Sequence, residues 1–391
     1  MAHWTIMAYL DFNATTPVRP LAAEEMLACL RGNPGNPSSV HRYGQQAAHL
    51  RETARQRVAA AAGTTSDRVI FTSGGTEADN LALHGFRQRG RHLVTAATEH
   101  EAVLHTSLEL GRRGMEITVL EVDREGRITP EGVRSALRSN TALVSLMAAN
   151  NETGVLLDLE AIGSICRQHG ALFHTDAVQY FGKIPLAFDD LPIDLASISS
   201  HKIGGPKGAG ALLVRRGIEV QPLFTGGGQE KKVRPGTENL PGIVGFGKAA
   251  ELAAEELPRE SRRIRALRDR LEGGIRSAIP EAMVNGENAE RLPNTSNVSF
   301  PGIDGHDLLV ALDLEGFAVS TGAACHAGAA EPSHVILAMG KARELASGSI
   351  RFSLGWETTD DQIDQLLQTL PELVRRMQST AITLRGETSQ T

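Results

Sequence analysis

The sequence predicts an α/β protein with a large mixed-sheet α/β domain and a smaller α+β domain toward the C-terminus. Between residues 69 and 216, short apolar runs alternate with amphipathic stretches of helical period. This is the pattern of strands and covering helices around a largely parallel sheet. Beyond residue 241, a long charged amphipathic helix is followed by strands and helices in mixed order. We therefore expect one domain over residues 15–250 and a second over residues 1–14 together with 251–391.

The individual elements follow from their local patterns. The predicted strands of the large sheet are the apolar runs VIFTS, HLVTAA, EITVLEV, TALVSLMAA, ALFHTDAV, DLASISS and GALLVRR. The predicted helices between them are the amphipathic stretches 76–89, 101–113, 130–138 and 158–169. In the smaller domain we expect a helix over 241–279, strands at 297–300, 317–320 and 349–354, and helices near 305–315, 332–339 and 359–378.

Composition and charge argue against several classes of protein. The 391 residues are 41% hydrophobic and 22% charged, unlike a disordered chain. A net charge of −6 argues against binding to nucleic acid, which normally needs a basic excess. The apolar runs are far shorter than the ~20 residues of a membrane span, and the N-terminus lacks a secretory signal pattern. Three cysteines are too few for a disulfide framework, so we expect a cytoplasmic protein with reduced thiols.

A glycine-containing turn, Thr72-Ser73-Gly74-Gly75-Thr76, follows the first predicted strand of the large sheet and opens a helical stretch. Glycines let a ligand approach the backbone, and free N–H groups at a helix N-terminus attract an anion such as phosphate. A plain helix cap explains the same residues. The turn has neither the lysine of a P-loop nor the GxGxxG spacing, which argues against an NTPase and a dehydrogenase.

Two of the predicted strands end near an acidic and a basic residue. Asp176 closes the run ALFHTDAV, and Lys202 follows DLASISS. Ligands of open α/β sheets bind at the carboxyl ends of strands. The two side chains could form a plain salt bridge. Alternatively, Lys202 forms a Schiff base with pyridoxal 5′-phosphate (PLP) while Asp176 keeps the pyridine nitrogen protonated. Together with the upstream phosphate-type turn, the order of these elements favours PLP.

Two further polar residues follow strands at the same expected sheet edge. His100 is a candidate to lie over a flat ring and to relay protons, although a lone histidine is more often a core or surface residue. Asn151 could hydrogen-bond a substrate or the ring oxygen O3′, and a polar turn explains it equally well. Their position along the strand order makes both residues candidates for the site.

Two residues of the smaller domain, Cys325 and Arg351, have side chains that are unusual for their sequence surroundings. Cys325 lies among small residues beside His326, which suits a nucleophilic thiolate, and a loop cysteine of no consequence is the alternative. A single Cys–His pair is a poor zinc site, so no metal is predicted. Arg351 lies inside an apolar strand pattern, where a charge is costly unless paired. A clamp on a substrate carboxylate and an internal salt bridge both explain it.

Taken together, these motifs resemble a known family, the cysteine desulfurases of the NifS/IscS type. The chain contains, in the family's order, the motifs YLDFNATTPV, GNPSSVHRYG, FTSGGTEADN, TEHEAVL, NNETG, HTDAVQ, SSHKIGGPKG, GGGQE, RPGTEN and SIRFSLG. The family belongs to the class V aminotransferase group and has the fold of fold-type I PLP-dependent transferases. The resemblance runs from Tyr9 to about Ile363, nearly the whole chain.

The resemblance implies a PLP site built from both copies of a homodimer. Lys202 would carry the cofactor, Asp176 would pair with its pyridine nitrogen, and His100 would stack on its ring. Thr237 of the partner subunit would reach the phosphate. The remaining residues implied to bind the cofactor are Gly75, Thr76, Asn151, Gln179, Ser199 and His201.

The resemblance also implies the reaction. Arg351 and Asn151 would bind the substrate, L-cysteine, and Lys202 would move the proton at its Cα. Cys325 would attack the substrate sulfur and become a persulfide, which is later delivered to an acceptor protein, while L-alanine is released. Iron–sulfur cluster biogenesis is the expected pathway, with tRNA thiolation, DNA modification and selenium metabolism left open.

One departure from the family pattern leaves the substrate open. The run Ala323-Ala324-Cys325-His326 is similar to that of selenocysteine lyases, so L-selenocysteine is an alternative substrate. The length of the segment up to His334 is that of the long-loop desulfurases. Another PLP-dependent aminotransferase or lyase would make Cys325 incidental. A non-enzymatic interaction platform is disfavoured, because a degenerate platform is expected to have lost Lys202.

Overall fold

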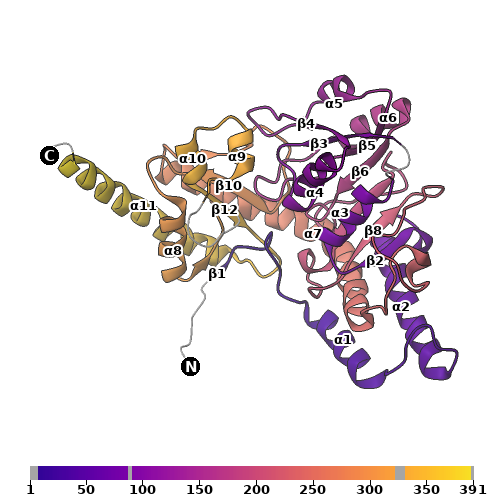
Figure 1. Cartoon of the computed structure of the whole chain (residues 1–391). Coiled ribbons are helices and arrows are strands. Elements are labelled where there is room, and N and C mark those ends of the chain that lie inside the picture. Colours follow the sequence, from indigo (N-terminus) through magenta and orange to yellow (C-terminus); the bar gives the residue numbers. More distant parts are fainter. Residues whose placement is uncertain (1–7, 87–89, 322–330, 389–391) are drawn as a thin grey trace.

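The computed structural model describes residues 8–86, 90–321 and 331–388, with side chains described up to residue 379 (Figure 1). A seven-stranded sheet has the strand order β2-β8-β7-β6-β5-β3-β4. Its strands are β2 (Val69–Thr72), β3 (His92–Ala96), β4 (Glu116–Leu120), β5 (Thr141–Ser145), β6 (Leu172–Asp176), β7 (Leu195–Ser199) and β8 (Gly210–Val214). Strand β8 runs antiparallel to both neighbours, and the other pairs are parallel. The predicted mixed sheet is confirmed, and each of the seven apolar runs contains one of its strands.

Helices cover both faces of this sheet. One face packs on α2, α5, α6 and the start of α7 around Phe71, Phe173 and Phe246. The opposite face packs on α3 and α4 around Leu81 and Leu143. Because strand residues alternate between two apolar layers, the strands are apolar throughout, which is why their sequence is easy to recognise. The helices of this unit are α1 (Pro20–Gly32), α2 (Arg42–Ala61), α3 (Gly75–His84), α4 (Glu101–Arg112), α5 (Pro130–Ala136), α6 (Leu159–His169) and α7 (Leu240–Ala278).

A second, smaller core follows in the chain. Strand β10 lies between β12 and β9 and is antiparallel to both. The start of the described chain joins this unit, since β1 (Ala8–Tyr9) pairs in parallel with β11 (Phe317–Ala318). The other elements are β9 (Met283–Val284), β10 (Thr295–Ser299), α8 (Gly305–Leu314), α9 (His334–Ala338), α10 (Arg343–Ser347), β12 (Ser349–Ser353) and α11 (Asp360–Thr388).

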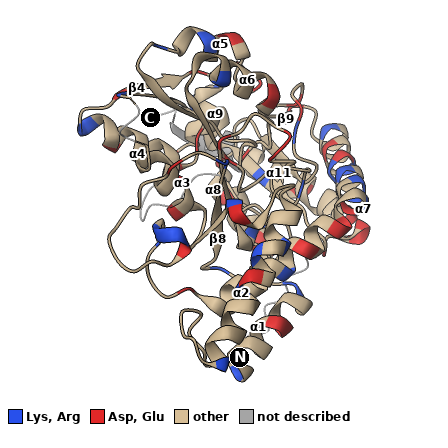
Figure 2. Ribbon diagram, turned by 90° about the vertical axis from the view of Figure 1, so that its right-hand side faces the viewer, with Lys and Arg blue, Asp and Glu red and all other residues tan. Residues whose placement is uncertain are grey.

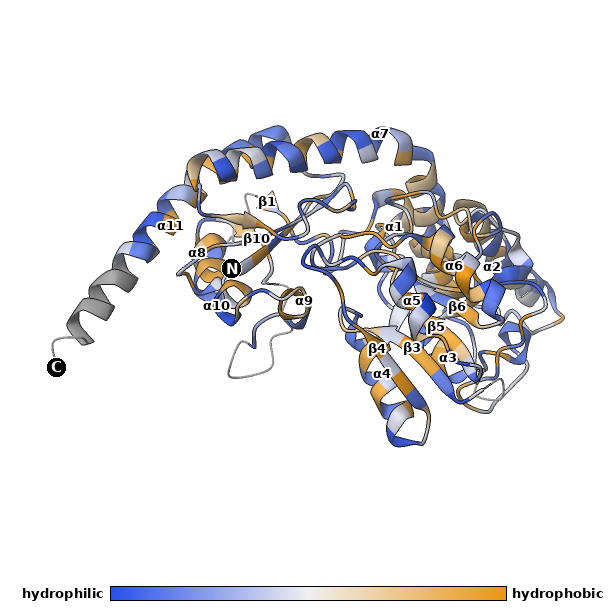
Figure 3. Ribbon diagram, turned by 90° about the horizontal axis from the view of Figure 1, so that it is seen from above, coloured by the Kyte–Doolittle hydropathy of each residue, from blue (hydrophilic) through white to orange (hydrophobic). Residues whose placement is uncertain are grey.

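Helix α7 connects the two units along one side of the molecule (Figure 3). Its first half places Phe246 in the larger core, and its second half places Leu271 in the smaller one. Lys, Arg, Asp and Glu residues are frequent along α7, where they colour the ribbon blue and red (Figure 2). The predicted boundary at residue 250 therefore falls inside a continuous helix, and the exact division into domains stays a prediction.

Helices α2 and α10 and strands β1 and β9 were not predicted, and each has a weak sequence signal. Helix α10 has only five residues. Helix α2 buries mainly alanines, such as Ala47, Ala54 and Ala59, so its apolar period is faint. Strands β1 and β9 have two residues each. In the part of the chain that the structure describes, none of the helices combines the length and apolarity needed to span a bilayer.

Candidate active site

A cavity of about 400 Å³ opens where several strands of the large sheet end, facing the smaller unit. Strands β6 and β7 end there at Asp176 and Ser199, and β12 contributes Arg351 from the opposite side. This is the edge at which α/β sheets bind ligands. The side chains and backbone that line it come from Asn13, Ala14, Gly75, Thr76, Asp79, His100, Glu101, Met147, Asn151, Glu152, Asp176, Val178, Gln179, Ser199, His201, Lys202, Ser320, His334 and Arg351.

One end of the cavity offers groups that suit an anion. Helix α3 starts at Gly75 without a side-chain cap, so its first N–H groups are not used by a capping side chain. A Cβ on Gly75 would lie 2.7 Å from Cγ2 of Val178, so the backbone approach here requires glycine. The buried hydroxyl of Ser199 has no hydrogen-bond partner among the described residues. Uncapped amides and an unpaired hydroxyl fit a phosphate group.

Asp176 has a buried carboxyl group in the cavity, and the buried carboxyl groups of Asp79 and Glu99 lie near it. Oδ1 of Asp176 accepts the backbone N–H of Val178 at 2.9 Å. Burial raises the pKa of Asp176, while the nearby His100 and Lys202 oppose that rise. Burial raises the pKa of Asp79 and Glu99 well above their ordinary values. Asp176 is the member of this group that faces cationic residues, and it suits a partner that is itself positively charged.

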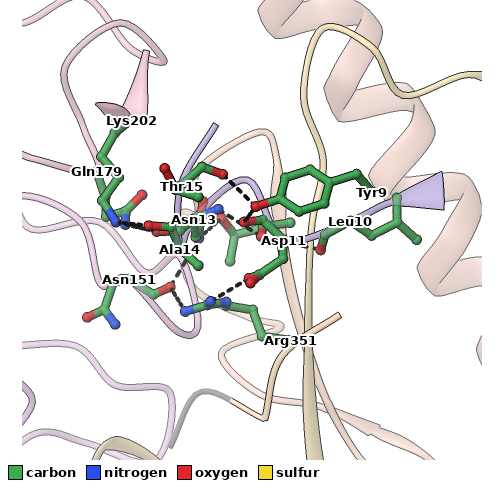
Figure 4. A network of polar contacts seen from close by, with 12 residues as sticks. Tyr9, Leu10, Asp11, Asn13, Ala14, Thr15, Asn151, Gln179, Lys202 and Arg351 are labelled. Carbon is green, nitrogen blue, oxygen red and sulfur yellow. Dashed lines mark hydrogen bonds and ion pairs between the residues drawn. The ribbon is translucent and has the colours of Figure 1, made fainter. Parts of the chain in front are cut away.

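The amine of Lys202 reaches the opposite wall of the cavity. Its Nζ donates to the carbonyl oxygens of Asn13 and Ala14, both at 2.7 Å (Figure 4). Burial is the largest cause that lowers the pKa of Lys202 to about 8, and Arg351 lowers it further, against the attraction of Asp176 and Asp11. A substantial fraction of this amine is therefore neutral near pH 8, as a nucleophile or proton carrier must be.

The guanidinium of Arg351 is held by two hydrogen bonds and still has N–H groups that are not used. Its Nη2 pairs with Oδ1 of Asp11 at 2.7 Å, and its Nη1 donates to the carbonyl oxygen of Asn151 at 3.1 Å (Figure 4). Its Nε is buried and has no hydrogen-bond partner among the described residues. Its side chain is 6% exposed. The internal salt bridge considered from the sequence thus exists, and the two hydrogen bonds use two of the five N–H groups of the guanidinium.

Ten of the twelve predicted site residues line this single cavity. His100 is exposed and caps α4, its Nδ1 accepting the N–H of Ala102 at 3.1 Å. Nδ1 of His201 lies 3.1 Å from Oγ1 of Thr15, and burial lowers its pKa to about 4. Thr237 is exposed and lies outside the cavity lining. Cys325 falls outside the described residues. The ten are Gly75, Thr76, His100, Asn151, Asp176, Gln179, Ser199, His201, Lys202 and Arg351.

Sequence reasoning missed three residues of the site. Asn13 lies in the motif YLDFNATTPV, where it looks like a turn residue, yet it is 1% exposed and contacts Lys202 through its backbone oxygen. Oε2 of Glu152 accepts the hydroxyl of Ser333 at 2.5 Å. His334 lines the cavity and lies 3.0 Å from the carbonyl oxygen of Glu99. Glu152 and Ser333 are 181 positions apart in the chain, and His334 and Glu99 are 235 apart. No local sequence pattern could therefore reveal these two contacts.

The chain belongs to the aminotransferase class-V family, whose signature matches residues 8–366. Within that family it is similar to NifS- and IscS-like proteins. It is 44% identical over 375 residues to the cysteine desulfurase IscS of Methanosarcina thermophila, which covers 95% of this chain and 93% of that protein. It is 45% identical over 374 residues to a cysteine desulfurase of Nostoc sp., which covers 95% of this chain and 94% of that protein.

Solved structures are similar over the same range. A NifS-like protein has a TM-score of 0.88 at 38% identity and covers 94% of this chain and 99% of its own. A structure of SspA in complex with cysteine has a TM-score of 0.77 at 35% identity, covering 88% of this chain and 98% of its own. The predicted fold, that of fold-type I PLP-dependent enzymes, is confirmed.

The buried carboxyl group of Glu152 predicts a pH-dependent stability. Burial raises its pKa to about 7, against the hydrogen bond from Ser333 and the charge of Arg351. Because the pKa is higher in the folded state than in the unfolded state, this group's stabilising effect is complete at low pH and is lost as the pH rises toward 7. We expect the ionisation of Glu152 to lower the free energy of unfolding of the wild type by about 2–3 kcal/mol as the pH rises, and Glu152→Gln to lack this decrease.

Urea unfolding at pH 5 and pH 8 measures this difference. Glu131→Gln is the matched control, because Glu131 is an exposed glutamate on α5. The control should keep the pH dependence of the wild type. Equal losses of unfolding free energy in Glu152→Gln and the wild type would contradict the assignment.

Proposed function

We propose that this chain is a PLP-dependent cysteine desulfurase that converts L-cysteine to L-alanine and transfers the sulfur to Cys325. The observation that carries the proposal is the convergence of Lys202, Asp176 and Arg351 on one cavity beside an anion-binding turn. Relatives 44–45% identical over nearly the full chain carry the name cysteine desulfurase. The pocket contains a lysine with a lowered pKa, a buried acid and an arginine with an unpaired N–H group. This combination suits a reaction on an amino acid.

The residues of the cavity fit PLP. The uncapped start of α3 and the unpaired hydroxyl of Ser199 suit the phosphate, and Asp176 suits a protonated pyridine nitrogen. Lys202 supplies the amine that would hold the aldehyde carbon. Bound in this way, PLP stabilises the negative charge that develops at Cα of an amino acid.

The chain's own residues then bind the substrate and move its protons. Arg351 orients the substrate carboxylate through its free Nε–H, and the backbone of Asn151 fixes the guanidinium from behind. The neutral amine of Lys202 takes the proton from Cα and returns it to the product. His100, exposed at the start of α4, is positioned to exchange protons with solvent.

Cys325 is the proposed sulfur acceptor. Its thiolate forms a bond to the substrate sulfur as the carbon–sulfur bond breaks, which yields a persulfide and, after reprotonation, alanine. Ser320, five residues earlier in the chain, lines the cavity and pairs with Arg351 through backbone hydrogen bonds of 2.6 and 3.2 Å.

A homodimer is part of the proposal. Thr237 lies outside this cavity, which suits a contact to the phosphate in the partner's site. Helix α1 also leaves apolar side chains uncovered, with Leu21, Leu27 and Leu30 exposed by 47%, 44% and 64%. Exposed large apolar side chains are typical of a surface that meets another chain. The proposed location is the cytoplasm, and the proposed role of the released sulfur is iron–sulfur cluster biogenesis through an acceptor protein.

The decisive assay measures sulfide and alanine from L-cysteine, and selenide from L-selenocysteine, with purified protein, PLP and dithiothreitol. We expect the wild type to release sulfide and alanine, and Cys325→Ala to release neither. Cys29→Ala, which alters a buried helical cysteine, is the control that should remain active. Activity confined to selenocysteine would instead identify a selenocysteine lyase. Sulfide release by Cys325→Ala at the wild-type rate would contradict the persulfide step.

The arginine assignment makes a separate prediction. Arg351→Ala should raise the KM for L-cysteine by about 10- to 100-fold, the loss expected for charge-assisted hydrogen bonds to a carboxylate. Arg270→Ala, on the exposed side of α7, should leave KM unchanged. Circular dichroism checks that both variants fold. A KM for Arg351→Ala equal to that of the wild type would refute the carboxylate contact.

A further inference from the structure

A second lysine lies close to Lys202, and the reaction described above does not use it. The amine of Lys183 donates to Oε1 of Gln179 at 2.6 Å and to Oδ1 of Asn13 at 3.0 Å. Within the described residues it forms no ion pair with a carboxylate. Burial lowers its pKa well below the ordinary value, and the charges of Lys202 and Arg351 lower it further. Enclosing an amine without a counter-charge is costly, and these two hydrogen bonds are what offsets that cost.

The contacts of Lys183 determine the orientation of a side-chain amide. The oxygen and nitrogen ends of an amide have nearly the same shape, so its neighbours decide which end points where. An amine with N–H groups to donate contacts the oxygen, which places Nε2 of Gln179 at the other end. There Nε2 donates to the carbonyl oxygen of Asn13 at 2.9 Å. The amide nitrogen has two hydrogens, and this contact uses one.

The free hydrogen belongs to a residue of the cavity lining. Gln179 lines the cavity together with Lys202, and Figure 4 shows the two side chains next to each other beside Asn13 and Ala14. The carbonyl oxygen of Asn13 accepts from both of them, from Lys202 at 2.7 Å and from Gln179 at 2.9 Å. The two donors are therefore held at one point of the cavity wall.

We propose that Lys183 is a positioning residue: it holds Oε1 of Gln179 and thereby directs the amide N–H of Gln179 toward the ring oxygen O3′ of PLP. The inference rests on the proposed function, because it requires PLP in the cavity. With the amide reversed, Oε1 would face an oxygen that carries negative charge, and the two would repel. Lys183 thus determines whether Gln179 stabilises or opposes the charge on the ring.

This role has a spectroscopic consequence. A donor to a ring oxyanion withdraws electron density from the ring, and so lowers the pH at which the nitrogen joining the ring to Lys202 loses its proton. The visible absorption band of the PLP-loaded protein changes with that protonation. Loss of the donor should raise the pH midpoint of the band by about one unit, the size expected for one ordinary hydrogen bond.

The other charged groups near Lys183 are the same in the wild type and in variants of Lys183 or Gln179. In the cavity, Asp11, Asp176, His201, Lys202 and Arg351 face the same region. The charged residues that line the neighbouring hollows with Lys183 are Arg19, Glu256, Glu260, Arg262, Arg265, Arg268, Glu287, Glu290 and Arg291.

The test is a pH titration of the visible absorption of PLP-loaded full-length protein. We expect the midpoint to rise by about one unit in Lys183→Met and in Gln179→Ala, and not to rise further in the double variant, because the two residues act through one contact. Thr295→Val is the matched control, since Thr295 accepts from Nδ2 of Asn13 at 2.9 Å without a bond to Gln179. Its midpoint should equal that of the wild type.

Every result of this experiment is informative. An unshifted midpoint in Lys183→Met, additive shifts in the double variant, or an equal shift in Thr295→Val would overturn the inference and leave the desulfurase assignment intact. A wild-type protein without a visible band would instead refute PLP binding, and the inference would fall with it. If Lys183→Met does not fold, Lys183→Gln takes its place. Its amide retains a donor for Oε1, so a small shift is expected and a full one-unit shift would overturn the proposal.

Discussion

The hydrogen bonds of Asn13 hold Lys202 and the two structural units in one arrangement. Its backbone oxygen accepts from Lys202 and Gln179, and its backbone N–H donates to Oγ of Ser353 at 2.9 Å in the smaller unit. Its side-chain nitrogen donates to the carbonyl oxygen of Asn151 at 3.0 Å, next to the backbone that orients Arg351. A buried amide left without these partners would be strongly destabilising, so the contacts hold the segment firmly. The relative position of Lys202 and Arg351 depends on it.

The second constraint is the charge balance around the cavity. Lys202, Lys183 and Arg351 face one another across a small volume, and the first two have lowered pKa values. Burial raises the pKa values of the acids Asp79, Glu99 and Asp176, and of these three Asp176 lies close to the cations of His100 and Lys202, which oppose the rise. Burial and repulsion thus favour the neutral form of the lysine amines, while nearby cations favour the negative charge of Asp176. That combination is what an amine needs in order to act as a nucleophile and proton carrier while an anion stabilises a protonated ring.

Sequence patterns predicted the sheet and most of the cavity for a physical reason. Strands covered on both faces must be apolar along their whole length, and a polar residue where such a strand ends, such as Asp176 or Lys202, stands out. Asn13 gave no such signal, because its partners, such as Thr295, lie far away in the chain. Lys183 gave none because its role depends on the fold, which brings Asn13 as well as the nearby Gln179 to its amine. Thr237 is exposed in one subunit, so its proposed role depends on a second copy.

The most direct test of this account is to find the amine that holds PLP. The PLP-loaded protein is reduced with borohydride, which fixes the cofactor to its lysine, then digested and analysed by mass spectrometry. The account predicts the added mass on the peptide containing Lys202, with Lys183 unmodified. A label on Lys183, or no labelled peptide from a protein that binds PLP, would contradict the proposed arrangement of the site.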